Sequence, residues 1–207
     1  MKKFFLLTLS LLLIVSCGKR EFSDPKELLK EYTAGLQKGE FYTDMWDLTE
    51  FAKIYYDKYI ATASKEDLDR LISNIEKFSK TVAKLNQKMA SNSYIESMEI
   101  VEDKPDLKKI TVVYSRKQTE EEKNLKLPKV SLGIVFVLKK YGETWKIINY
   151  ERMMYAEREL DIVKTFKENL PNMLKDAGYN PDTLTLKQIN DFFETKILNP
   201  QKEVNNK

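Results

Sequence analysis

Side chains that carry nucleophilic or metal-binding chemistry are scarce in this chain of 207 residues. Histidine is absent, and cysteine occurs once, at Cys17. The nucleophile–histidine pairs of hydrolases and the usual zinc sites therefore cannot form. Paired carboxylates remain possible in principle. We expect a binding protein and not an enzyme, with no catalytic residue, no metal and no cofactor.

The single cysteine ends a recognisable N-terminal pattern. Two lysines follow Met1, and residues 4–15 form an apolar run shorter than the ~20 residues that span a bilayer. Ser16 and Cys17 come next, which is typical of a bacterial lipobox. The sequence thus predicts that Cys17 is lipidated and becomes the first residue of the mature protein. The alternative is an ordinary signal peptide with an incidental cysteine.

The predicted processing defines the expected domains, charge and location. We expect a lipoprotein signal peptide over 1–16, a lipidated cysteine and tether over 17–24, one domain over 25–199 and a disordered tail over 200–207. Removing the leader lowers the formal net charge from +3 to +1, so no electrostatic case for a nucleic-acid partner exists. The expected location is the bacterial cell envelope, with the chain lipid-anchored to a membrane and facing the periplasm or exterior.

The central apolar stretch, residues 127–154, predicts two strands joined by a turn. Its large apolar side chains fall at every second position and would share one face of a strand; they are Val130, Leu132, Ile134, Phe136 and Leu138. A turn at 141–143 leads to a return strand from Trp145. The rest of the chain must cover this face, either completely or with room for a guest.

The segments before this stretch predict three helices. Asp24 and Pro25 suit the start of a helix ending near Gln37. A second helix is expected from Asp44 to Thr62, and Tyr55 and Tyr59 lie on its apolar stripe, where they serve either core packing or ligand contact. Ser64 and Asp67 match a capping box, opening a third helix whose apolar spacing continues to Met89.

The remaining segments complete an α+β chain. Strands are predicted over 94–101 and around 110–114, which gives a four-stranded antiparallel meander. The acidic loop at 119–123 is either a solvated tip or a cation site. Helical spacing returns after Tyr150 and runs to Gly178, with Pro171 expected to kink or split the helix. Thr185 and Gln188 predict the cap of a last helix.

Residues 47–64 resemble a segment of MlaC-type proteins, the soluble lipid-binding components of a phospholipid-transporting ABC system. The coinciding residues are Asp47, Ala52, Tyr59 and Ala63. Residues 145–149 resemble the family's last strand, and Phe166 and Gly178 fall near its closing helix. The order of elements agrees over about 160 residues.

The departures from the family pattern are specific. Asp57 stands where the family has glycine, Ile60 where it has tryptophan, and Asn149 where it has aspartate. Residues 153–156 replace another family motif. A generic NTF2-like lipoprotein would share the architecture without the function.

The resemblance implies an NTF2-like cone that binds phospholipid non-covalently between its sheet and helices. The implied partners are phospholipid, the membrane and an ABC-type lipid transport complex. The residues that suit the lining of such a cavity are Tyr55, Tyr59, Leu132, Ile134, Phe136, Met153 and Met154. The alternatives are a scaffold or protein-interaction module with a filled core, and a carboxylate-based hydrolase. An anchored protein of this kind would work at one membrane.

Overall fold

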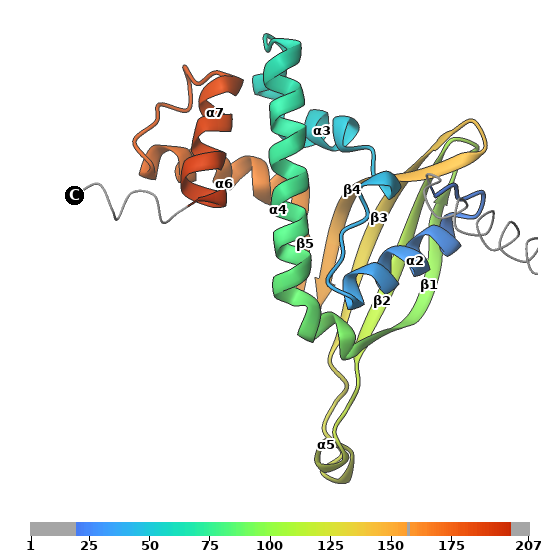
Figure 1. The fold of residues 1–207 in the computed structure, drawn as a ribbon. Helices are drawn as coiled ribbons and strands as arrows, with labels where there is room; N and C mark the ends of the chain where they lie inside the picture. Colours follow the sequence, from blue (N-terminus) through green and yellow to red (C-terminus); the bar gives the residue numbers. More distant parts are fainter. Residues whose placement is uncertain (1–19, 157, 200–207) are drawn as a thin grey trace, which may run out of the picture.

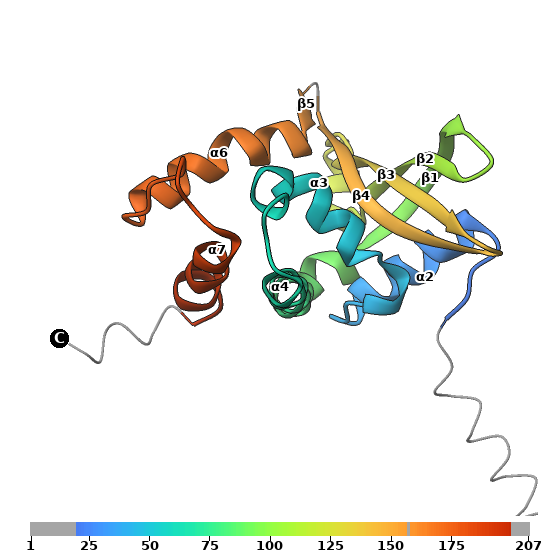
Figure 2. The same ribbon diagram turned by 90° about the horizontal axis from the view of Figure 1, so that it is seen from above.

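The computed structural model describes residues 20–156 and 158–199. Figures 1 and 2 show helices α2, α3 and α4 against one face of a single antiparallel sheet, with α6 and α7 beyond α4 and away from α2. The predicted α+β class is therefore confirmed. The predictions for Cys17 and the leader, and those for 200–207, fall outside the described residues.

The N-terminal helices begin where side chains satisfy free backbone N–H groups. Helix α2 (Pro25–Gln37) starts after Asp24, whose carboxylate accepts a bond from the amide of Lys26. After a 3-10 turn, η2 (Thr43–Met45), helix α3 (Leu48–Ile60) is capped by Asp47. The expected start of this helix at Asp44 was wrong, because the Asp47 carboxylate accepts the free amides of the first turn.

Helix α4 (Lys65–Ser91) begins at the predicted cap, where the Ser64 hydroxyl accepts from the Asp67 amide at 3.0 Å. Its first half is covered: Leu71 and Ile75 are buried. Its last turns are not, since Leu85 is 77% exposed and Met89 66%. One apolar stripe thus runs from the core into solvent along the same helix.

The sheet has five strands and not the expected four. They pair antiparallel in chain order and comprise β1 (Ser93–Asp103), β2 (Leu107–Arg116), β3 (Ser131–Tyr141), β4 (Thr144–Tyr155) and β5 (Arg158–Asp161). The helix predicted to follow Tyr150 was wrong over its first eleven residues. The chain continues as β4 and folds back as β5, and helix α6 (Ile162–Asp176) starts only after Asp161 caps it.

Strand register fixes which residues face the helices. The side facing them contains the fully buried Ile110, Phe136, Leu138 and Ile147, which pack with Leu28 and Leu29 of α2. Register shifts in β4 add two residues opposite β3, and shifts in β1 add two opposite β2. Such bulges bend and twist a sheet. Strand β1 forms one free edge and bears four acidic side chains, Glu96, Glu99, Glu102 and Asp103.

The remaining elements are a short helix in the connection between β2 and β3 and the C-terminal helices beyond α4. The acidic loop contains a short helix, α5 (Glu120–Asn124), and α6 continues through Pro171 instead of splitting there. The predicted capping box at Thr185 is confirmed and opens α7 (Leu186–Phe192), which is followed by a π-helix, η3 (Phe193–Leu198). Arg70 of α4 holds this end by donating to Asp191 at 2.8 Å and to Glu194 at 2.7 Å.

Candidate functional site

The space between the sheet and the first helices is filled by aromatic rings. We call the set of Tyr32, Trp46, Tyr55, Phe136 and Tyr150 the aromatic cluster. Phe136 lies 6.1 Å from Tyr32 and 5.3 Å from Tyr150 between ring centroids, and Trp46 lies 4.9 Å from Tyr150. These edge-to-face distances are those of closely packed rings. This part of the interior has no room for an additional chain.

The phenol groups in the aromatic cluster have partners. The hydroxyls of Tyr32 and Tyr150 share a hydrogen bond of 2.7 Å, and Tyr55 donates to the Tyr150 carbonyl at 3.1 Å. Nearby, Thr33 and Tyr114 share a bond of 3.1 Å. Burial raises the pKa of Tyr32 and Tyr150 well above the ordinary value, and raises the pKa of Tyr114 to about 12. These phenols remain neutral at physiological pH and act as structural hydrogen-bonding groups.

Three of the predicted lipid-binding residues lie in this packed interior. Phe136 is 1% exposed, Tyr55 4% and Tyr59 7%. Tyr55 also stacks on Phe51 at 4.3 Å and meets the edge of Phe166 at 5.1 Å. Their surroundings are protein side chains, and they can contact a ligand only if these neighbours move.

Three other predicted residues lie further along the same face, towards the end of the sheet where the helices stop covering it. Ile134 pairs with Met153, which pairs in turn with Leu160 of β5. Leu132 pairs with Tyr155, one rung further out. Leu132, Ile134 and Met153 are half-buried, whereas Tyr155 is 55% exposed and Leu160 46%. We call these five residues the open sheet end.

Met154 is the one predicted residue that the fold separates from the others. Neighbouring residues of a strand point to opposite faces, so Met154 lies on the side away from the helices. There it pairs with Gly133, where a β-carbon would come within 2.8 Å of the Met154 methyl group. The missing side chain at Gly133 makes room for Met154. The two methionines cannot line one surface together.

Helix α4 supplies a second exposed apolar surface that the sequence did not single out. Phe78, Val82, Leu85 and Met89 recur at helical spacing, and we call them the α4 stripe. Phe78 meets the ring of Phe193 at 5.9 Å, which covers the stripe at its upper end. Figure 2 shows α3 between α4 and β4, and Figure 1 shows α3 beside the upper turns of α4, with the lower turns extending beyond it. The last turns of the stripe and the open sheet end lie at the same end of the molecule.

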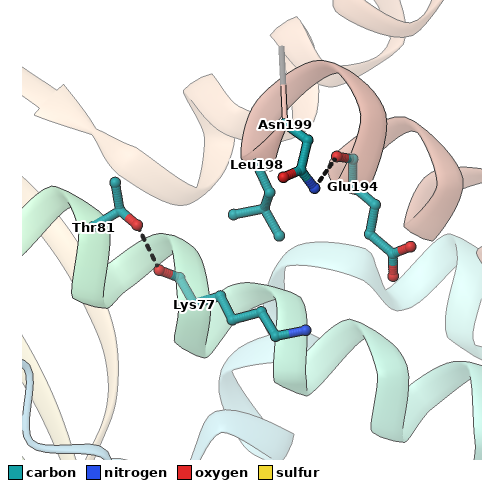
Figure 3. Close-up of a pocket in the computed structure, with 5 residues that line it drawn as sticks. All are labelled: Lys77, Thr81, Glu194, Leu198 and Asn199. Carbon is teal, nitrogen blue, oxygen red and sulfur yellow. Dashed lines mark hydrogen bonds between the residues drawn. The ribbon is translucent and has the colours of Figure 1, made fainter. Parts of the chain in front are cut away.

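A polar pocket of about 470 Å³ lies on another side of α4, against η3. Figure 3 shows its lining residues, Lys77, Thr81, Glu194, Leu198 and Asn199. Asn199 donates to the Glu194 carbonyl at 3.0 Å, and the Glu194 carboxylate accepts from Arg70 and Asn74. Because polar atoms dominate its walls, this pocket is unsuited to an acyl chain.

Neither a membrane-spanning helix nor a metal-binding cluster is found among the described residues. Within 20–156 and 158–199, no helix is long and apolar enough to cross a membrane. The same residues contain no cluster of three or more acidic, histidine or cysteine side chains arranged to hold a metal ion. One acidic residue of α5, Glu122, has a structural role: it accepts from the Thr119 amide and forms an ion pair with Arg116.

Comparisons with known proteins give a likeness to solved structures and none to known sequences. No family model and no curated protein sequence matches the chain. Among solved structures, the chain is similar to the phospholipid-binding protein from Ralstonia solanacearum, solved in complex with a phospholipid. The two are 14% identical, the similarity covers 80% of this chain and 84% of that one, and the TM-score is 0.48. Membership of the MlaC-type family therefore stays a prediction.

Proposed function

We propose that this protein binds phospholipid, with an acyl chain lying between the open sheet end and the α4 stripe. One observation supports this above all. The apolar face of the sheet does not end where the packed core ends, but continues outward through Ile134 and Leu132 to the exposed Tyr155 and Leu160. Each methylene group that leaves water against such a surface contributes about 0.8 kcal/mol. A cone of the NTF2-like type, open at this end, would account for the arrangement.

A phosphate group suits the same end of the molecule. Lys84 and Lys88 stand one turn apart on α4, beside Leu85 and Met89, and both are exposed. No ion pair is found for either lysine among the described residues. A lipid with its acyl chain along the stripe would place its phosphate near these ammonium groups, which bind phosphate as point charges. Acyl chains themselves require no fixed polar group, so the lysines would supply the orientation.

We further propose that the protein is a membrane-anchored lipoprotein of the cell envelope, attached through Cys17, that exchanges lipid with a transport complex of the ABC type. This rests on the basic start, the short apolar run and the Ser16–Cys17 pair of the sequence. We also propose that it is not an enzyme, because the apolar surface offers binding and no reactive group.

The deciding experiment is to measure lipid in protein purified without detergent. We expect mass spectrometry to detect co-purified phospholipid in the wild type and less in Leu85→Asp, which introduces a charge into the stripe. Val101→Asp is the matched control, because Val101 is also exposed, at 52%, but lies near the opposite end of the sheet. Lipid absent from the wild type, or reduced equally by both substitutions, would contradict the proposal.

A second candidate is a scaffold or protein-interaction module. The observation that favours it is the aromatic cluster, which fills the interior where the cavity was expected. In that case the exposed apolar residues would contact a protein. Purified wild-type protein would then contain no lipid, while Leu85→Asp would weaken association with the partner.

A further inference from the structure

The connection between β2 and β3 forms a hairpin that extends away from the rest of the molecule (Figure 1). We call residues 117–130 the finger. Its tip bears two large apolar side chains in solvent, Leu125 at 63% and Leu127 at 48% exposed. No residue of α5, which forms the tip, is buried. Apolar side chains on a projecting element that contributes nothing to the core require another explanation.

The finger is internally braced, which argues against an unstructured loop. Thr119 and Glu122 form a reciprocal capping box at the start of α5. Gln118 donates to the Leu127 carbonyl at 2.8 Å, and the Leu127 amide donates to the Glu122 carbonyl at 3.0 Å. The Leu125 amide in turn reaches the Glu121 carbonyl at 2.9 Å. These bonds hold the finger in a defined shape, from which the two leucines extend into solvent.

The charges of the finger leave cations unbalanced beside the leucines. Glu122 pairs with Arg116 and Glu120 with Lys123. Lys126, which separates Leu125 from Leu127, is exposed and has no ion pair among the described residues. Lys117 is likewise exposed and has no ion pair among the described residues. The same holds for the acidic Glu121, so these three unpaired charges sum to +1.

The surface continues from the finger onto α4. The Lys117 amide donates to the Asn92 carbonyl at 2.9 Å, which joins the base of the finger to the end of α4. Met89, Leu85 and their flanking lysines lie in the last two turns before this junction. The end of the molecule therefore presents leucines and lysines on two adjoining elements. This combination matches a bilayer, whose anionic headgroups attract lysine and whose interface accepts leucine.

We propose that the finger contacts an anionic phospholipid bilayer, with Leu125 and Leu127 entering the interface and Lys117 and Lys126 against the headgroups. This goes beyond the proposed lipid binding, because it concerns how the protein approaches a membrane. It would also place the open sheet end next to the lipid surface.

The contact is separate from the predicted anchor. The Trp145 amide donates to the Phe22 carbonyl at 2.8 Å, which fixes the N-terminal segment at the end of the sheet opposite the finger. The eleven residues of β3 span about 35 Å between these ends. The five residues from Cys17 to Phe22 reach at most ~18 Å. An anchor at Cys17 therefore does not by itself bring the finger to a membrane.

Tryptophan quenching tests the proposal in the full chain. The native Trp46 and Trp145 are 4% and 3% exposed, so they are shielded from lipid. An indole is introduced by Leu127→Trp at the tip, and by Val101→Trp near the opposite end as the matched control. Each variant is mixed with vesicles of phosphatidylethanolamine and phosphatidylglycerol with brominated acyl chains, which quench indoles within the bilayer. Melting temperatures near the wild-type value check that both variants fold.

We expect brominated vesicles to quench the fluorescence of the tryptophan introduced at position 127. The fluorescence of the tryptophan introduced at position 101 should be retained. Adding Lys126→Glu or raising the salt concentration should reduce the quenching at 127. Absence of quenching at 127, or equal quenching at both positions, would overturn the proposal and point to a protein partner. Co-purified lipid is measured separately. A negative quenching result would therefore leave the proposed lipid binding intact, and absence of co-purified lipid would leave the proposed membrane contact of the finger intact.

Discussion

Tryptophan substitutions at two positions of β3 distinguish a packed core from a lipid-binding surface. Leu132 and Leu138 point to the same face of the same strand. Leu138 is fully buried and pairs with Ile147, whereas Leu132 is half-buried beside the exposed Tyr155. The change Leu138→Trp therefore overpacks a filled interior. The change Leu132→Trp places the same ring at the open sheet end, where solvent or lipid can be displaced.

The expected costs differ by several-fold. Overpacking a core lowers the free energy of unfolding by roughly 1–3 kcal/mol. For a domain of this size each kcal/mol lowers the melting temperature by about 2–4 °C, so Leu138→Trp should lower it by about 2–12 °C. A substitution at a surface with room for the new side chain changes stability by about 0.5 kcal/mol or less. If the open sheet end is such a surface, Leu132→Trp should shift the melting temperature by no more than about 2 °C.

The assay combines melting, followed by circular dichroism, with lipid content measured by mass spectrometry. Both are done on protein as purified and after delipidation. We expect Leu132→Trp to melt near the wild type and to lose co-purified lipid. If Leu132→Trp lowers the melting temperature as much as Leu138→Trp and leaves lipid unchanged, the open sheet end is part of the core and the reasoning is refuted.

Three further predictions concern other regions. Because burial raises the pKa of Tyr32 and Tyr150, these phenols ionise first in the unfolded chain, so the free energy of unfolding should fall above about pH 10, by up to ~1.4 kcal/mol per pH unit for each phenol. In a pH titration, the ultraviolet absorbance of ionised tyrosine from these two residues should appear only as the helical circular dichroism is lost. Ionisation of these phenols at a pH where the protein is still folded would contradict the prediction. Arg70→Ala should lower the free energy of unfolding by about 1 kcal/mol and make the chain near Glu194 susceptible to limited proteolysis. The control Lys164→Ala, at an exposed ion pair, should do neither. Cys17→Ser should release the protein from membranes or leave its precursor uncleaved; fractionation like the wild type would exclude the predicted anchor.

The sequence predicted best those features that depend on neighbouring residues. Three helix starts, at Asp24, Ser64 and Thr185, follow from a side-chain oxygen within reach of amides two or three residues ahead. The alternation in β3 is equally local. Its consequence, a shared face from Leu132 to Leu138, is present in the fold.

The end of the sheet was mispredicted because its signal is ambiguous. Met153, Ala156, Leu160 and Val163 fit a helical period, yet residues up to Tyr155 extend β4. All four residues of β5 are exposed, so they show no alternation that could reveal a strand. The assignment also decides the site, since strand geometry places Met153 and Met154 on opposite faces of the sheet.

The filling of the interior depends on contacts between distant segments. Tyr32 and Tyr150 lie 118 residues apart and meet through their hydroxyls. Their spacing along the chain gives no indication of this contact. The tyrosines of α3 were compatible with a core and with a ligand site. Only the positions of Phe51 and Phe166 in the fold show that protein side chains surround Tyr55.

The free edge of β1 affects how copies of this protein behave when they are concentrated. An exposed strand edge can accept a strand from another chain and start aggregation. Here the two bulges interrupt the row of free amide and carbonyl groups. Charged side chains stand along the edge, where Glu96, Glu102 and Asp103 form ion pairs with lysines. A second copy aligning with this edge would meet mismatched spacing and would have to bury these charged groups. We therefore expect neighbouring molecules to remain separate even when crowded on one membrane.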